Sequence, residues 1–296
     1  MKRHVGAWRA TAAALHQARG IDISGVRSVG LFLGPYRNLT TLTAAVLFLH
    51  PHCQVLNHAG RRIFQRHRLD FLARYDEATF DHFVRYAIHQ SAGGQRGAAG
   101  GSITHSHAFT GEYKVRDIFE SSGNDLVKSD IRSLVWKESL ATANHIRSSR
   151  ADLDAIFETE TRLRFLVPVR HPIDAAISNV TKHFAGRFEG LTNEASVEQV
   201  IDAILDEYLW VQTLRVRHPE RFFVFFEHST GRDTLAALAR FLELDPLDSW
   251  LDPATEAFEV KARYDHPQEL VERLQAGVES RFADHPDFAD GLRAFR

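Results

Sequence analysis

The sequence predicts an α/β fold in which a parallel β-sheet is flanked by helices. Short apolar runs alternate with longer segments of helical periodicity along the 296 residues. Hydrophobic residues make up 44% of the chain, which is enough to form a sizeable core. Because this alternation fits one sheet better than two, we expect a single domain over residues 1–296.

Five short apolar runs are predicted to be strands, and strands that alternate with helices form parallel sheets through βαβ units. In chain order these runs are 29–34, 54–58, 134–136, 164–169 and 221–227. Helical patterns cover 40–50, 76–90, the segment after Pro172, the segment after Ser196 and 234–244. Ser196 and Gln199 form a capping box, and Pro172 suits the first turn of a helix.

Two segments lie outside this alternation. We expect residues 1–27 to form a helical extension, because Arg9 and His16 interrupt the apolar run that a signal peptide would need. Residues 93–101, GGQRGAAGG, contain five glycines and cannot hold a helix. This glycine-rich loop is either a mobile loop beside a site or a plain connector.

Charge, hydropathy and cysteine content indicate which partners and which compartment to expect. The 36 basic and 38 acidic residues give a net charge of −2, whereas nucleic-acid and anionic-membrane binders need a basic surplus. No apolar run is long enough to span a bilayer. The single cysteine, Cys53, fits a reducing compartment. We therefore expect a cytoplasmic protein that binds neither nucleic acid nor membranes.

The loop after the first predicted strand, GPYRNLTT at 34–41, is a candidate anion site. Leu39 and Thr40 replace the second glycine and the lysine of a nucleotide-binding P-loop, so an ATPase or GTPase is disfavoured. The free N–H groups of the next helix, the hydroxyls of Thr40 and Thr41 and the guanidinium of Arg37 could still bind an anion. Alternatively, Thr40 only caps the helix and Arg37 is solvated.

A second candidate anion site follows the strand at 164–169. Arg170 lies at the carboxyl end of this strand and Ser178 lies in the next helix. Both can face the crevice in which open α/β sheets bind ligands, where they could hold a phosphate group. In the alternative interpretation, Arg170 is buried against Asp174 and Ser178 bonds the backbone of its own helix.

These two segments, in this order, resemble the sulfotransferases that use 3′-phosphoadenosine 5′-phosphosulfate (PAPS). The family motif R-x-P-x-D-x-x-x-S, which binds the 3′-phosphate, is matched at each fixed position by Arg170, Pro172, Asp174 and Ser178. The motif P-[RK]-S-G-T-T-[WL], which binds the 5′-phosphosulfate, is matched in part by YRNLTTL at 36–42. Weaker similarity to the family extends over residues 29–245.

The resemblance implies a sulfotransferase of P-loop NTPase-like architecture with PAPS as its co-substrate. It would move a sulfuryl group by in-line transfer to a hydroxyl or amine of a small-molecule or saccharide acceptor. The residues implied to contact the cofactor are Arg37, Asn38, Leu39, Thr40, Thr41, Arg170 and Ser178. Arg37 would also act in catalysis, by stabilising charge on the leaving 5′-phosphate. The alternatives are a nucleotide kinase or phosphotransferase with a degenerate P-loop, and an inactive nucleotide-binding protein of the same fold.

A general base must accept the proton of the acceptor. His58 ranks first, because it ends a predicted strand in the region where tyrosylprotein-type members of the family carry a catalytic glutamate. His105 ranks second, because it follows Thr104 as in the Thr-His pair of cytosolic members. Glu138 ranks third, because it follows the strand before Arg170.

No metal ion is expected to take part. The segments 50–53 and 105–107 offer close pairs of histidine or cysteine ligands. However, nothing in the sequence marks the further ligands that a closed, four-coordinate zinc site needs.

Overall fold

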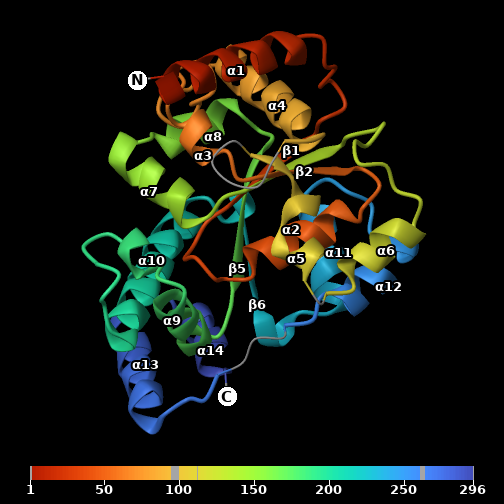
Figure 1. Ribbon diagram of the computed structural model, residues 1–296. Coiled ribbons are helices and arrows are strands. Elements are labelled where there is room, and N and C mark those ends of the chain that lie inside the picture. The colour runs from red at the N-terminus through yellow and green to blue at the C-terminus, as the bar shows by residue number, and fades with distance from the viewer. Residues whose placement is uncertain (1, 95–99, 112, 261–263, 296) are drawn as a thin grey trace.

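A mostly parallel sheet occupies the centre of the molecule (Figure 1). The computed structural model describes residues 2–94, 100–111, 113–260 and 264–295. Within these residues the sheet has six strands in the order β3-β2-β4-β1-β5-β6, and β3 runs antiparallel to β2. The strands are β1 (Ser28–Phe32), β2 (Cys53–Asn57), β3 (Gly101–Ser102), β4 (Ser133–Lys137), β5 (Leu163–Val169) and β6 (Phe222–Phe226). The predicted α/β fold with a parallel sheet flanked by helices is confirmed.

Helices cover both faces of the sheet. Successive strand residues point to opposite faces, so the buried apolar strands present a hydrophobic surface on each face. Along β1, for example, Val29 and Leu31 pack into one hydrophobic cluster and Phe32 packs into the other. The first face is covered by α1 (Lys2–Ala18), α3 (Gly60–Ile63), α4 (Glu77–Ser91), α7 (Leu140–Ser149), α8 (Leu153–Thr159), α9 (Pro172–Thr181), α10 (Val197–Arg217), α13 (Gln268–Arg281) and α14 (Pro286–Arg293). The second face is covered by α2 (Thr40–Phe48), α5 (His107–Thr110), α6 (Val115–Ser121), α11 (Arg232–Phe241) and α12 (Asp248–Ala257). Short 3₁₀ turns are η1 (Ile103–His105), η2 (Ala185–Arg187), η3 (Pro219–Arg221) and η4 (Glu227–Ser229).

Local sequence signals explain where several helices begin. The Ser196 hydroxyl accepts the N–H of Gln199 while the Gln199 side chain accepts the N–H of Ser196, so the predicted capping box begins α10. Pro172 opens α9 as its first residue. Near the N-terminus, helix α1 packs against α4 (Figure 1). The assignment of the whole chain to one domain stays a prediction.

The glycine-rich segment is described only in part, because residues 95–99 lie outside the described residues. Gly94 pairs with Gly101 in an antiparallel bridge, and Gly101 begins β3, a strand that the sequence pattern did not predict. Gly100 has a positive φ of 73°, and a Cβ added to it would lie 2.5 Å from the Cβ of Ala59. Only glycine therefore allows this close approach to the end of β2.

The carboxyl ends of the parallel strands lie in register along one edge of the sheet. Asn57 at the end of β2 pairs with Lys137 at the end of β4, and Val169 at the end of β5 pairs with Phe226 at the end of β6. The residues that directly follow these four strands are His58, Glu138, Arg170 and Glu227. Since β1 lies between β4 and β5, the loop that follows β1 lies between the first pair and the second.

Candidate active site

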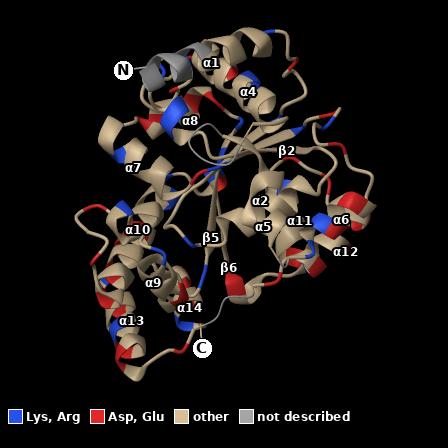
Figure 2. Ribbon diagram, in the orientation of Figure 1, with Lys and Arg blue, Asp and Glu red and all other residues tan. Residues whose placement is uncertain are grey.

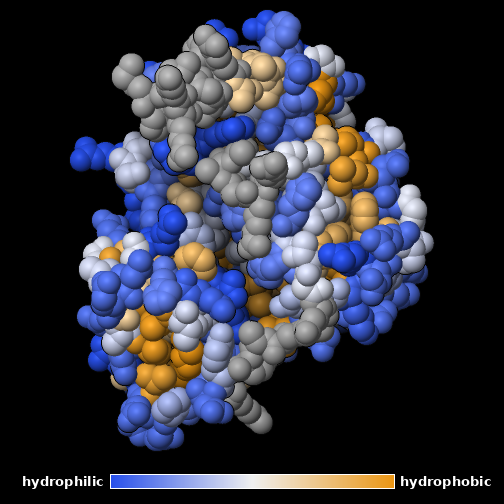
Figure 3. Space-filling view, viewed as in Figure 1, coloured by the Kyte–Doolittle hydropathy of each residue, from blue (hydrophilic) through white to orange (hydrophobic). Residues whose placement is uncertain are grey.

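A cavity of about 690 Å³ opens at the carboxyl edge of the sheet. Its walls include the loop 36–42 and the residues that follow β2, β4 and β5, namely His58, Glu138 and Arg170. Figure 3 shows this face of the molecule hollowed near its middle. This edge is where open α/β sheets bind ligands, and the cavity is large enough for a small-molecule site.

The loop between β1 and α2 presents a helix N-terminus to the cavity. Leu39 is the N-cap of α2 and adopts a left-handed conformation with φ 60°, and its carbonyl accepts bonds from the N–H and hydroxyl of Thr43. The turn therefore forms although a leucine stands where the resembling family motif has glycine, at a cost of about 1–2 kcal/mol. Thr40 and Thr41 line the cavity in the first turn, where N–H groups have no partner within the helix.

Asn38 holds this loop to the end of β5. Its side chain is fully buried, and its Oδ1 accepts the N–H of Arg170 at 2.8 Å and the hydroxyl of Tyr208 at 2.7 Å. Its Nδ2 donates to the carbonyl of Pro168. The side chain of Asn38, expected to contact the cofactor, is thus occupied by these scaffold bonds. Only its backbone could take part in binding a ligand.

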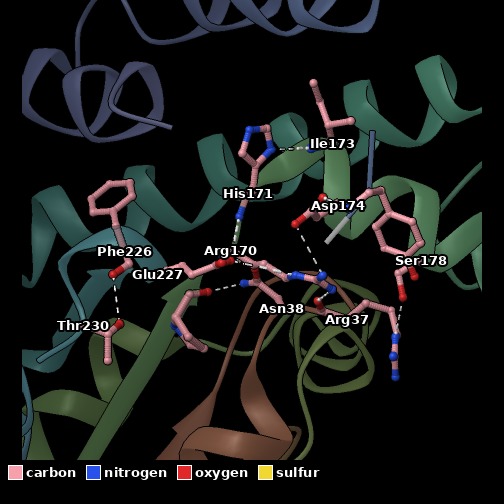
Figure 4. A network of polar contacts seen from close by, with 12 residues as sticks. Arg37, Asn38, Arg170, His171, Ile173, Asp174, Ser178, Phe226, Glu227 and Thr230 are labelled. Carbon is pink, nitrogen blue, oxygen red and sulfur yellow. Dashed lines mark hydrogen bonds and ion pairs between the residues drawn. The ribbon is translucent and has the colours of Figure 1, made fainter. Parts of the chain in front are cut away.

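Arg37 and Ser178 join the two candidate anion sites. The Nε of Arg37 donates to the Ser178 hydroxyl at 2.8 Å (Figure 4), although the residues lie 141 positions apart. Ser178 is buried on α9 and Arg37 lines the cavity. The Ser178 hydroxyl therefore bonds an arginine from the other site, and not the backbone of its own helix as the alternative interpretation had it.

Arg170 lies between the cavity and two carboxylates. Its Nη2 is 3.5 Å from Asp174 Oδ2 and its Nε is 3.9 Å from Glu227 Oε2 (Figure 4). Its side chain is only 4% exposed, yet the residue lines the cavity. Figure 2 shows blue Lys and Arg segments near β5 in the middle of the molecule. The carboxylates of Asp174 and Glu227 balance the charge of this buried guanidinium beside the cavity.

Further groups complete the surroundings of Asp174. Its Oδ1 accepts the N–H of Tyr264 at 3.2 Å and contacts the Nε2 of His266 at 2.8 Å. No sequence motif marks His266, which lies 92 positions from Asp174. Glu227 could have been identified as a partner of Arg170, because Arg170 directly follows one predicted strand and Glu227 ends another.

His58 and Glu138 form a pair on the other side of the loop. The Nδ1 of His58 lies 3.5 Å from Glu138 Oε1, and both residues line the cavity. His58 (φ 64°) and Ala59 (φ 84°) are both left-handed, a strained conformation for residues with a Cβ. The turn is held by Trp136 Nε1, which donates to the His58 carbonyl at 2.6 Å, and by the N–H of Gly60, which donates to Glu138.

The Glu138 carboxylate is stabilised in its charged form. Burial alone raises its pKa, but hydrogen bonding and the charge of His58 act in the opposite direction. The charge of Lys137 and the N–H of Gly60 add to this effect, so the pKa of Glu138 lies below its ordinary value. The first-ranked and third-ranked candidates for the general base thus meet in one pair, in which the buried carboxylate orients the imidazole.

The structure does not bring His105 to the cavity. It is exposed at the end of η1 and is not among the described residues that line the cavity. His107, two positions later, lines the cavity instead. The expectation of a catalytic role for His105 is therefore corrected, because the turn of η1 directs it to solvent. Of the 17 histidines in the chain, sequence pattern alone could not select His107.

No three His, Cys, Asp or Glu side chains in the described part of the chain are grouped to hold a metal ion. None of the described helices is both long enough and apolar enough to cross a membrane.

No protein-family model and no curated protein sequence matches the chain. Among solved structures, it is similar to the mouse sulfotransferase SULT7A1 complexed with PAP, at 10% identity over 95% of this chain and 92% of that one, with a TM-score of 0.45. It is also similar to sulfotransferase STF9 from Mycobacterium avium, at 13% identity over 94% of this chain and 81% of that one, with a TM-score of 0.46. A third is the sulfotransferase domain of the Synechococcus PCC 7002 olefin synthase, at 15% identity over 91% of this chain and 88% of that one, with a TM-score of 0.39.

Proposed function

We propose that this protein is a PAPS-dependent sulfotransferase that moves a sulfuryl group to a hydroxyl or amine of an acceptor. The observation that carries the proposal is the hydrogen bond from Arg37 Nε to Ser178 Oγ at 2.8 Å. It joins the two segments that resemble the phosphosulfate and 3′-phosphate motifs of that family. A nucleotide with anionic groups at both its 3′ and 5′ positions needs two such sites within the length of one molecule.

The residues present fit such a nucleotide. Arg170 and Ser178 would hold the 3′-phosphate, since Arg170 is a buried cation that lines the cavity. Arg37 and the N–H groups in the first turn of α2 would hold the 5′-phosphosulfate. Bound PAPS would supply the sulfuryl group, which leaves the 5′-phosphate oxygen and bonds to the acceptor while the acceptor proton passes to a base.

His58 is the proposed base. Because its Nδ1 faces Glu138, the imidazole would carry its proton there and keep the lone pair of Nε2 for the acceptor proton. Glu138 would act as a positioning residue that holds this tautomer. Arg37 would stabilise the charge that develops on the leaving phosphate, as preorganised cations do in group transfer.

Calorimetry with adenosine 3′,5′-bisphosphate, 5′-AMP and ATP measures nucleotide binding and tests the proposal directly. We expect the bisphosphate to bind most tightly, and Ser178→Ala and Arg170→Ala to weaken it, the latter by about 1.5–3 kcal/mol. Binding of 5′-AMP should change much less, because it lacks the 3′-phosphate. Arg164→Ala is the control, since Arg164 lies on β5, the strand that Arg170 follows, and does not line the cavity.

The outcomes separate the candidate functions. An equal loss of both nucleotides in Ser178→Ala, which removes only a hydroxyl, would mean that this site is structural. A preference of the unsubstituted protein for ATP would favour a kinase or phosphotransferase. Bisphosphate binding without any release of bisphosphate from PAPS, across a panel of phenols and saccharides, would favour an inactive nucleotide-binding protein.

The base is tested by substituting the two histidines separately. His58→Ala should lower turnover by about 10²–10⁴-fold while nucleotide affinity stays nearly unchanged. His105→Ala should retain turnover within a few-fold, because His105 is exposed away from the cavity. A folded His58→Ala variant with full turnover would exclude His58 as the base.

A further inference from the structure

The cavity carries more positive charge than a nucleotide site alone accounts for. The described residues that line it include a single carboxylate, Glu138, which is already paired with His58. The cations that line it are Arg37, Lys137, Arg170, Arg61 and Arg187. Arg37 and Arg170 belong to the proposed nucleotide sites. Among the described residues, neither Arg61 nor Arg187 forms an ion pair, although both lie at the cavity wall.

Arg187 is held in place through its backbone while its side chain stays exposed. It ends η2, where its carbonyl accepts the side-chain amide of Asn144 at 3.0 Å. The N–H of Gly186, the preceding residue, donates to Asn193 Oδ1 at 3.0 Å. An arginine with an anchored backbone and no carboxylate partner can bind an anion without breaking an existing ion pair.

Arg187 lines the same cavity as His58 and Glu138, the residues of the proposed base. Burial and the charge of Glu138 raise the pKa of Tyr36 to about 12, and the charge of Arg187 opposes this rise. The Tyr36 hydroxyl thus interacts electrostatically with both the Glu138 carboxylate and the Arg187 guanidinium. The part of the cavity wall formed by Tyr36, Arg187 and the residues of the proposed base is the acceptor end in the proposed function.

Aromatic side chains form walls at the same end. The rings of Tyr36 and Phe184 have centroids 6.1 Å apart, and Phe184 is a large apolar side chain left 37% exposed. Phe64 also lines the cavity, from the segment after α3, and its ring stacks on His145 at 3.9 Å. Such faces bind flat aromatic rings or the C–H faces of sugars.

From these observations we infer that the acceptor is a ring compound that carries a carboxylate in addition to its reactive hydroxyl, and that Arg187 binds this carboxylate. The inference rests on the proposed function, because it takes this end of the cavity as the acceptor site. Two classes of compound combine a ring, a hydroxyl and a carboxylate in this way: hydroxyaryl carboxylates and uronic acid sugars. A guanidinium binds either carboxylate through two parallel hydrogen bonds.

Matched pairs of probes test the inference by calorimetry, without nucleotide. One pair is 4-hydroxyphenylacetate and its neutral amide, and the other is methyl glucuronide and methyl glucoside. We expect the anionic member of one pair to bind at least about tenfold more tightly than its neutral partner. The pair that shows this preference identifies which of the two classes of compound is the acceptor. In Arg187→Gln the preference should fall to about threefold or less, whereas Arg150→Gln, which changes an exposed arginine that does not line the cavity, should keep it.

Arg187→Gln changes an exposed side chain, so the variant should fold, and circular dichroism checks this. Equal affinity within both pairs, or a preference that survives Arg187→Gln, would overturn the inference. Because the probes are titrated without nucleotide, these results are independent of PAPS. A failure of the proposed function would appear only in the titrations with adenosine 3′,5′-bisphosphate.

Discussion

The Nδ1 of His58 lies 3.5 Å from Glu138 Oε1, although 80 positions (138 minus 58) separate the two residues. The pair follows from strand register, because Asn57 and Lys137 are partners at the ends of β2 and β4. Each next residue leaves its strand at the same edge and at the same level. The same relation between β5 and β6 places Arg170 beside Glu227.

Loss of the Glu138 charge should destabilise the fold in a pH-dependent way. The pKa of Glu138 is lowered in the folded protein, so its contribution to stability is present above the ordinary glutamate value near 4.5 and is lost as pH falls through the lower folded value. Glu138→Gln should therefore lower the free energy of unfolding at pH 7 by about 1–3 kcal/mol. Urea denaturation at pH 7 and at pH 3.5 measures this, and a deficit that stays the same at both values would contradict the prediction.

Asn38 should matter for stability more than its partner Tyr208. Asn38→Ala leaves both the N–H of Arg170 and the hydroxyl of Tyr208 without their acceptor, at a cost of about 2–4 kcal/mol. Tyr208→Phe removes only one donor and should cost about 1 kcal/mol. Thermal or chemical denaturation of both variants provides the comparison. Similar losses in the two variants would show that Asn38 does not organise the loop.

Replacement of Leu39 by glycine should leave the protein more stable than replacement by alanine. Its φ of 60° is disfavoured for any residue with a Cβ and is freely available to glycine. Both substitutions remove the leucine side chain, so the difference between them isolates the backbone. We expect Leu39→Gly to be about 1 kcal/mol more stable than Leu39→Ala in chemical denaturation. A more stable alanine variant would mean that the loop changes its conformation in the variants.

Lys128 should be a source of instability at neutral pH. It is 5% exposed, and its Nζ lies 4.5 Å from the ring centre of Phe48 and has no hydrogen-bond partner among the described residues. Burial lowers its pKa from 10.5 to about 8. The unfolded chain therefore binds more protons than the folded protein between these values, and stability should rise with pH across that window.

Lys128→Met removes the buried charge and should raise the free energy of unfolding by about 1–3 kcal/mol at pH 7. The gain should shrink toward pH 10, where the amine is neutral in the folded protein. Urea titrations at pH 7 and pH 10 measure this gain in the free energy of unfolding. Lys182→Met, which changes an exposed lysine, is the control. A less stable Lys128→Met variant at pH 7 would show that the contact of the cation with the Phe48 ring outweighs desolvation.

The sequence by itself determined the five parallel strands, most of the helices that follow them, and the two segments expected to bind an anion. These features are local: strand and helix periodicity, the capping box of Ser196 and Gln199, and a motif from Arg170 to Ser178 each depend on residues within one or two elements. The position of Arg170 directly after a strand also predicted its place at the carboxyl edge of the sheet.

Only the tertiary structure decided which side chains meet across that edge. Strand order and register bring His58 to Glu138, while η1 turns His105 to solvent. The buried bonds of Asn38 join residues from β5 and α10, and no local pattern encodes such a contact. The cavity wall likewise combines Arg61 of α3 with Arg187 of η2, which lie far apart in the sequence. These contacts form between segments far apart in the chain, so their geometry exists only once the sheet has assembled.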